Sequence, residues 1–205
     1  MNHDPERLRK QMEFSLEIDK EKSITRQNYT ADGSRRENDT EHAWHMAVMA
    51  LILSEYANEP VDLLKTVSMI LIHDLVEIDA GDTYAYDEDG KLTQRQRELA
   101  AAERIFNILP KDQAARFREL WDEFEERKTP ESKFARTLDN IQPAMLNAAS
   151  GGISWQEHQV RLSSILKRNE ISPEGAGALW DYSRENFIMP NVENGIITDD
   201  RQDVI

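Results

Sequence analysis

A histidine and an aspartate stand side by side at the end of a strongly apolar segment. His73 and Asp74 directly follow the apolar run 67–72, and further acids follow at Glu77 and Asp82. An ionisable pair on such a segment is costly to bury unless it is hydrogen-bonded, paired or bound to a cation. A metal ion is the simplest way to satisfy this pair, and a hydrogen-bonded core pair is the alternative.

A second histidine stands at the predicted start of another helix. Asn38 and Glu41 have the three-residue spacing of a capping box, and apolar residues then recur at helical spacing. His42 therefore occupies the first turn of a core-facing helix, as a ligand or simply as a helix residue. His45, three residues further on, is interpreted as a core residue or as support behind the ligands.

An acid far downstream supplies a candidate fourth ligand. Asp139 adjoins an apolar stripe at helical spacing, formed by Phe134, Leu138, Ile141 and Met145. A solvated acid or an internal cap is the alternative for this position. Two imidazoles and two carboxylates suit one divalent ion such as Mn, Co, Fe, Ni or Zn, with positions left for water and substrate, and suit Mg less well. The chain has no cysteine, which excludes a thiolate zinc site.

The helical period predicts how the acids lie around His73. At about 3.6 residues per turn, Glu77 shares a face with His73, while Asp74 is rotated by about 100 degrees. Glu77 is thus expected to reach a water molecule beside the metal without being a ligand itself.

In order and spacing, these residues resemble the HD-domain superfamily of metal-dependent phosphohydrolases, most closely its 5'-deoxynucleotidase branch. The resemblance runs from about Ile24 to about Phe187. It rests on Glu41-His42, His73-Asp74, Glu77, Gly81-Asp82 and Asp139.

The resemblance implies a role for each matching residue. The metal ligands would be His42, His73, Asp74 and Asp139. Glu77 and Asp82 would orient or deprotonate the attacking water and protonate the leaving oxygen, although Asp82 could also be a plain loop residue. Arg26 would bind the substrate phosphate. An all-α fold and a homodimer are also implied.

The chain departs from that branch beside the predicted phosphate-binding arginine. Where the nucleotidases tend to carry an aromatic residue, this sequence has Gln27. A strict preference for a 2'-deoxy sugar is therefore not expected. Arg35 and Arg36 also lie near the site in sequence, and either is an alternative phosphate ligand to Arg26.

Length and composition limit the class of protein. With 205 residues the chain is long enough for one domain with a sizeable core. The absence of cysteine and of an apolar amino-terminal stretch favours a soluble cytoplasmic protein without disulfides, and no segment is apolar enough for a membrane span. A net charge of −14 makes nucleic acid an unsuitable partner and favours a small-molecule nucleotide.

The pattern along the chain predicts a single helical bundle of about seven or eight helices. Asp4-Pro5 begins the first helix. The others are expected at about 40–57, 61–78, 93–109, 111–127, 130–149, 154–169 and 173–187, with an irregular polar stretch at 24–39. The HD phosphohydrolase domain is expected to span 1–190, and 191–205 to form a loosely ordered acidic tail. Residues 79–90, with Thr83, Tyr84 and Tyr86 among them, could form a mobile rim over the metal cleft or a plain solvated loop.

Together these features predict an all-α, metal-dependent phosphomonoesterase acting on nucleoside 5'-monophosphates. An HD-type phosphodiesterase or alarmone hydrolase is the alternative enzyme. The alarmone hydrolases carry Glu-Asp after the His-Asp pair, where this chain has Glu77-Ile78. A catalytically silent nucleotide-binding regulatory domain is the non-enzymatic alternative.

Overall fold

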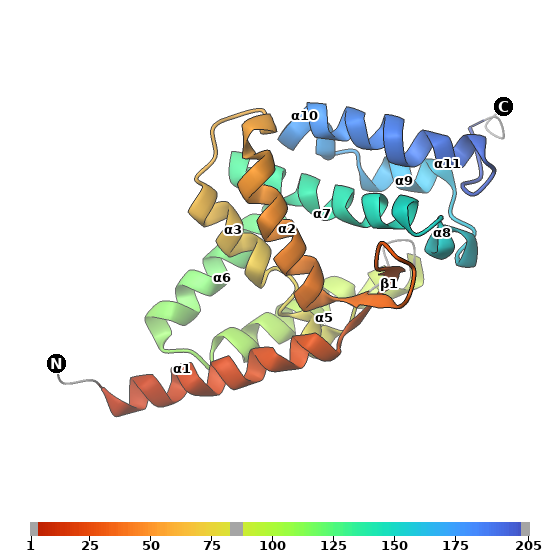
Figure 1. The fold of residues 1–205 in the computed structure, drawn as a ribbon. Helices are drawn as coiled ribbons and strands as arrows, with labels where there is room; N and C mark the ends of the chain where they lie inside the picture. The colour runs from red at the N-terminus through yellow and green to blue at the C-terminus, as the bar shows by residue number, and fades with distance from the viewer. Residues whose placement is uncertain (1–3, 83–87, 202–205) are drawn as a thin grey trace.

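The fold is helical, as predicted, and is built around one long central helix. The computed structural model describes residues 4–82 and 88–201, so residues 83–87 of the predicted rim lie outside the described residues. Helix α7 (Pro130–Ala149) runs through the middle of the molecule, with α10 (Ser172–Ser183) beside it and with α2 (Asp39–Leu53) and α3 (Leu63–Ile72) crossing its amino-terminal half (Figure 1).

The remaining helices surround this centre. They are α1 (Pro5–Glu17), η1 (Ile18–Ser23), η2 (Ser54–Tyr56), α4 (Glu77–Ala80), α5 (Glu88–Phe106), α6 (Lys111–Glu126), α8 (Ile153–Glu157), α9 (Leu162–Arg168), η3 (Arg184–Ile188) and α11 (Met189–Glu193). Among the described residues, no helix is both long and apolar enough to cross a bilayer.

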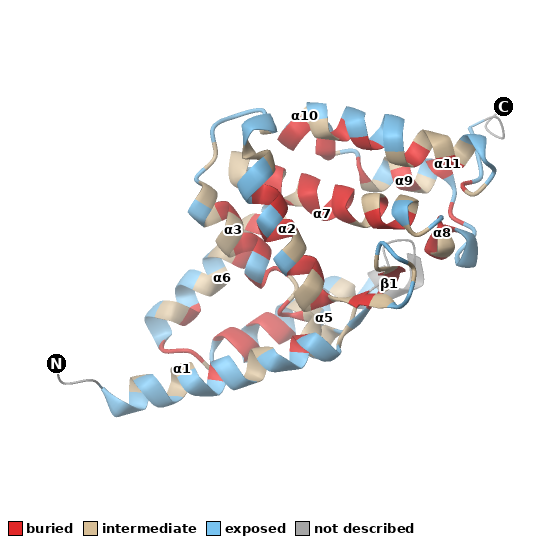
Figure 2. Ribbon diagram, viewed as in Figure 1, coloured by how far each residue is buried: buried red, intermediate tan, exposed pale blue. Residues whose placement is uncertain are grey.

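The central helix begins where the sequence specifies a start. The Thr129 hydroxyl accepts a hydrogen bond from the Ser132 backbone N–H, Ser132 caps Thr129 in return, and Pro130 occupies the first helical position, where its missing N–H costs nothing. Phe134 and Leu138 of the predicted stripe are fully buried. Figure 2 shows buried residues along much of α7, as expected for a helix enclosed by others.

Two predicted helices are each interrupted. The expected helix at 61–78 ends at Ile72, where His73 is the C-cap, and a short turn separates it from α4. The expected helix at 154–169 breaks between α8 and α9, where Gln159 has a φ of 49°, in the left-handed region that ends a helix. The apolar periodicity continues across both breaks, because each contains buried apolar residues. These are Leu75 and Val76 in the turn after His73, and Val160 between α8 and α9.

A β-hairpin replaces the irregular stretch expected at 24–39. Strands β1 (Thr25–Tyr29) and β2 (Arg36–Asn38) pair antiparallel. Their inward-facing residues are Arg26, Asn28 and Glu37, which are all buried. Strand prediction depends on apolar residues alternating with polar ones, so a hairpin that buries polar side chains gives no such signal.

Part of the segment after Pro190 packs against the domain. Ile197 is buried, and the backbone N–H of Leu162 donates to the carbonyl oxygen of Thr198 at 2.9 Å. These contacts extend into the segment that the sequence assigned to a loose tail. The division of the chain at residue 190 stays a prediction.

Gly175 sets the approach of α10 to α7 and provides a test of this packing. A Cβ at Gly175 would lie 2.2 Å from the carbonyl oxygen of Lys133 and 2.4 Å from the hydroxyl of Thr137. We expect Gly175→Ala to lower the free energy of unfolding by about 3 kcal/mol, or roughly 6 to 12 °C in Tm, because the two helices must separate. Thermal and urea unfolding measure the change.

Gly177→Ala is the matched control on the same helix. The nearest atom to a Cβ there is Asn58 Oδ1, at an ordinary 3.8 Å. Its stability should change little, and equal losses in the two variants would show that α10 does not pack on α7 as described.

Candidate metal centre

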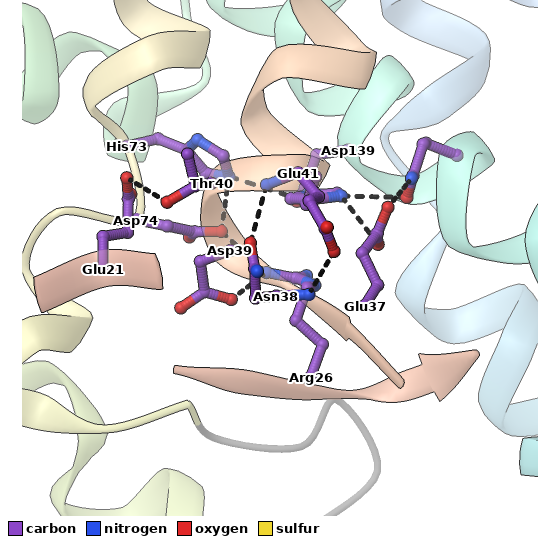
Figure 3. A network of polar contacts seen from close by, with 12 residues as sticks. Glu21, Arg26, Glu37, Asn38, Asp39, Thr40, Glu41, His73, Asp74 and Asp139 are labelled. Atoms are coloured by element: carbon purple, nitrogen blue, oxygen red, sulfur yellow. Dashed lines mark hydrogen bonds and ion pairs between the residues drawn. The ribbon is translucent and has the colours of Figure 1, made fainter. Parts of the chain in front are cut away.

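Two histidines and an aspartate from three different helices meet inside the bundle. His42 lies in the first turns of α2, His73 caps α3 and Asp139 lies in the middle of α7, and all three are buried. Asp139 Oδ1 lies 3.1 Å from His42 Nε2 and 3.8 Å from His73 Nε2 (Figure 3). One potential ligand atom from each residue falls within 4.8 Å of the others. The sequence expectation that these residues converge agrees with this geometry.

Asp74, the other predicted ligand, lies beside this group. Its Oδ2 is 3.0 Å from His73 Nε2 and also accepts a hydrogen bond of 2.7 Å from Arg26 Nη1. The helical-face argument placed Asp74 away from His73, and that was wrong because α3 ends at Ile72 and the chain turns there. The turn brings the Asp74 carboxylate against the His73 imidazole.

The hydrogen bonding of His73 tests whether a cation fits. Its Nδ1 lies 2.7 Å from the carbonyl oxygen of Ile70, which can only accept, so Nδ1 carries the hydrogen. Nε2 is buried and faces the carboxylates of Asp74 and Asp139, and its 3.0 Å contact with Asp74 Oδ2 is an ion pair without an aligned hydrogen bond. A lone pair next to two carboxylates requires positive charge between them. The donor set therefore suits a divalent cation.

The pKa shifts show the same demand for positive charge. Burial lowers the pKa of His73, but the carboxylates of Asp74 and Asp139 outweigh burial and raise it to about 9. Burial and the nearby Arg26 lower the pKa of His42, which favours a neutral imidazole. Burial raises the pKa of Asp139, but His42, Arg136 and Arg168 together hold it well below its usual range.

Two arginines fix how Asp139 is oriented. Arg136 Nη1 donates to Asp139 Oδ2 at 2.9 Å, and Arg168 Nη2 lies 3.7 Å from the same oxygen. Arg136 is itself held by Glu125 at 2.8 Å and lies over the ring of Phe124. With Oδ2 held by guanidinium groups, Oδ1 is left to face the two imidazoles.

A cavity of about 120 Å³ adjoins the cluster. Its charged end contains Arg26, Glu77, Asp82, Arg136 and Arg168, and two of these, Arg26 and Arg136, hydrogen-bond to Asp74 and Asp139. Its other walls are formed by Gln27, Asn28, Gln94, Asn140, Pro143, Ala144, Asn147, Ser154, Trp155, Ile165 and Asn169. The cavity lining thus combines charged, polar and a few apolar side chains.

Glu77 and Asp82 both line this cavity, as a role in proton transfer requires. Glu77 Oε2 is buried without a hydrogen-bond partner, and burial, together with the charges of Asp74 and Asp39, raises the pKa of Glu77 well above its usual range. Asp82 follows Gly81, whose φ is 74°, and burial raises its pKa as well. Raised carboxyl pKa values in a cleft are typical of groups that exchange protons.

The predicted substrate-binding residues lie at the same cavity. Arg26 Nη1 donates to Asp39 Oδ1 at 3.0 Å as well as to Asp74, and its Nε is buried without a partner. Gln27 accepts a hydrogen bond from Arg36. Arg35 and Arg36, the alternative phosphate ligands, do not line the cavity. Arg35 is exposed and forms an ion pair with Glu41.

Sequence reasoning missed four side chains that shape the site. Arg136 and Gln142 each lie three residues from Asp139, so helical spacing alone would have placed them near its face. Glu37 and Arg168 contact the site only through tertiary packing, and no local pattern marks them. Gln142 Oε1 lies 2.8 Å from His42 Nδ1, and Gln142 Nε2 donates to Glu37 Oε1 at 2.7 Å.

Comparison with known proteins agrees with this fold and site. The human 5'-deoxynucleotidase HDDC2 is 32% identical over 108 residues, which cover 53% of this chain and 52% of the human protein. The chain thus spans about half the length of this curated relative. The Dictyostelium discoideum protein of the same name is 28% identical over 137 residues, or 64% of this chain and 72% of that one.

A solved structure matches almost the whole chain. The crystal structure of a "predicted metal-dependent phosphohydrolase" from Magnetospirillum magnetotacticum MS-1 is 43% identical, covers 96% of this chain and 99% of its own, and superposes with a TM-score of 0.90. The HD domain family matches residues 18–180. The resemblance that the motif residues indicated is confirmed, and the chain belongs to the HD domain family.

Proposed function

We propose that this protein is a divalent-metal-dependent phosphohydrolase that removes phosphate from nucleoside 5'-monophosphates. The observation that carries the proposal is the buried Nε2 of His73, which makes no aligned hydrogen bond and faces the carboxylates of Asp74 and Asp139 beside a cavity lined by three arginines. The names of the relatives, 5'-deoxynucleotidase and metal-dependent phosphohydrolase, support the same reaction class.

The metal would be held by His42, His73, Asp74 and Asp139. Mixed imidazole and carboxylate ligands favour Mn, Co, Fe, Ni or Zn over Mg. When bound, the ion would polarise the phosphate and lower the pKa of a water molecule to near neutrality.

Glu77 and Asp82 would handle the protons of the reaction. Attack of water on phosphorus needs a base for the water proton, and the departing 5'-oxygen needs an acid. Both carboxyls line the cavity, and burial raises the pKa of each above its usual range, as is typical of groups that exchange protons. We assign the water to Glu77, since its Oε2 makes no other hydrogen bond.

Arginines would bind the phosphate and an apolar wall the nucleoside. Arg26 lies on the cavity wall next to Asp74, and Arg168 lines the same cavity, so guanidinium groups are available there for a phosphate. Guanidinium groups form paired, charge-assisted hydrogen bonds with phosphate oxygens. Trp155 and Ile165 offer apolar contact for a base, and the amide of Gln27 could hydrogen-bond a sugar hydroxyl.

The expected homodimer is supported by an apolar face on α2 and α3. Trp44, Ile52 and Leu64 are 64%, 63% and 74% exposed, and α2 carries no charged side chain after Glu41. Large exposed apolar patches mark interaction sites. An uncharged face is also where two copies with a net charge of −14 can approach each other. A cytoplasmic location stays a prediction from the sequence.

Phosphate release from a panel of nucleotides tests the reaction. With added Mn or Co we expect hydrolysis of nucleoside 5'-monophosphates and none after chelation. Because Gln27 lacks aromatic bulk, kcat/KM for dAMP and AMP should differ by less than about a hundredfold, or 2.7 kcal/mol. A larger deoxy preference would show that another residue guards the sugar. Hydrolysis of phosphodiesters or guanosine polyphosphates alone would make the alternative enzyme class correct.

Metal analysis of Asp74→Ala tests the ligand set. The wild-type chain should bind one equivalent of divalent ion, and the ion at a hundred times its Kd should stabilise the fold by about 2.7 kcal/mol. Asp74→Ala should lose both effects. Asp79→Ala, an exposed acid paired with Arg104, is the control and should keep both. A full equivalent of metal in Asp74→Ala would remove Asp74 from the ligand set.

Glu77→Gln separates proton transfer from metal binding. We expect kcat to fall by about 10² to 10⁴ while metal content and KM stay close to wild type, because the amide keeps the shape but cannot accept the proton. The control is Glu21→Gln, a buried acid that does not line the cavity, whose kcat should change little. Loss of the metal from Glu77→Gln would mean that Glu77 is a ligand.

A further inference from the structure

A chain of buried polar side chains leads from the β-hairpin to His42. Glu37 on β2, labelled in Figure 3, accepts a hydrogen bond from Gln142 Nε2 of α7 at 2.7 Å. Gln142 Oε1 lies 2.8 Å from His42 Nδ1. Glu37 is 4% exposed, and Gln142 and His42 are both 0% exposed. Hydrogen bonds this deep are not exchanged for water, so their donors and acceptors must match.

The carboxylate of Glu37 decides which way the Gln142 amide points. A carboxylate only accepts, so the amide must present its NH₂ group to Glu37. The second N–H of that group points to His45 Nδ1 at 3.2 Å, and Asn28 Nδ2 donates to the other oxygen of Glu37 at 2.9 Å. The flipped amide would place an oxygen against the carboxylate and would lose the contacts of Nε2 with Glu37 and His45.

The orientation of the amide in turn decides the tautomer of His42. Since Gln142 Oε1 can only accept, His42 Nδ1 must carry the hydrogen, and in the neutral imidazole that binds a metal Nε2 is left with its lone pair. That lone pair points to the Asp139 side of the cluster, where His42 Nε2 lies 3.1 Å from Oδ1. The other tautomer would point an N–H at the place where a cation must bind.

We propose that Glu37 and Gln142 are positioning residues that set His42 in the tautomer able to bind the metal. This inference rests on the proposed function, because it needs His42 to be a ligand. His73 does not depend on this pair, since the backbone carbonyl of Ile70 fixes its tautomer. Groups that orient a metal-binding histidine typically contribute 10- to 100-fold to metal affinity.

The pair also links the metal to the hairpin that carries Arg26. Glu37 lies on β2, and Arg26 and Asn28 lie on β1, with which β2 pairs. Asn28 holds Glu37, and Glu37 holds Gln142, so the strand that presents Arg26 to the cavity also orients the His42 ring. The buried polar residues that prevented prediction of the hairpin from the sequence are thus the ones that connect it to His42.

Gln142→Met in the full-length protein tests the proposal. Methionine keeps the length of the side chain but cannot accept from His42 Nδ1. We expect Co²⁺ affinity, measured by competition with a chelator, to fall about 10- to 100-fold. Activity should recover at saturating Co²⁺, because the ligand itself is still present. In the metal-free wild type, ¹⁵N shifts of the His42 ring should show the hydrogen on Nδ1, and in Gln142→Met a mixture of tautomers.

A swap of the two side chains separates orientation from simple packing. In Gln142→Glu alone, two carboxylates face each other, and Co²⁺ affinity should drop. Adding Glu37→Gln restores a single carboxylate that accepts from His42 Nδ1, so the double variant should recover to within about threefold of wild type, a difference below 1 kcal/mol. Thr137→Val is the control, a buried α7 hydroxyl bonded to Lys133 and Ser172. It should lose stability but keep Co²⁺ affinity.

Each alternative result has a defined meaning. Wild-type Co²⁺ affinity in Gln142→Met, a metal-free His42 ring without a hydrogen on Nδ1, or a double variant no better than Gln142→Glu would each overturn the proposal. If the wild-type chain binds Co²⁺ but hydrolyses no nucleotide, the proposed reaction is wrong while the affinities still decide this inference. If the wild-type chain binds no divalent ion, the proposed function and this inference are both wrong.

Discussion

The structure depends on the balance of charge at one buried point, where the carboxylates of Asp74 and Asp139 meet the imidazoles of His42 and His73. Taking such groups out of water costs several kcal/mol per ion unless partners replace the lost hydration. Arg26 and Arg136 supply part of this compensation through hydrogen bonds of 2.7 Å and 2.9 Å. The raised pKa of His73, about 9, shows that the carboxylates still attract a further positive charge. A proton can meet that demand, and a divalent ion meets it with more charge.

This requirement explains several irregular features of the fold. Helix α3 ends at Ile72, and the turn that follows places Asp74 against His73, which a continuing helix would not do. The carbonyl of Ile70 and the indole of Trp121, which donates to the His73 carbonyl oxygen at 3.2 Å, hold the turn from both sides. The hairpin buries Arg26 and Glu37 instead of apolar residues, because its inner face serves the polar cluster and not the apolar core.

The residues of the His–Asp cluster could be predicted from the sequence better than the residues that surround it. His42, His73 and Asp139 could be found because each is an ionisable residue on a segment with apolar periodicity, a local signal. Only some of the arginines that line the cavity could have been identified from the sequence. Arg136 could have been found from its spacing to Asp139, whereas Arg168 reaches the cavity from α9 by tertiary packing alone. Arg35 and Arg36 were close in sequence but pair with Glu41, Gln27 and Glu157, which shows that proximity along the chain is a poor guide to a phosphate site.

The same charge balance bears on how a phosphate could enter a protein with a net charge of −14. Arg26 and Arg136 are each bonded to a carboxylate, and Glu77 and Asp82 line the same cavity, so the guanidinium groups leave no excess of positive charge. A divalent ion bound by Asp74 and Asp139 would change this balance by two units without any new side chain. It would also compete with Arg26 for the oxygens of Asp74, which frees guanidinium donors on the cavity wall. On this physical basis, binding of the ion and binding of a phosphate favour each other, because the carboxylates that hold the ion are the ones that otherwise neutralise the arginines.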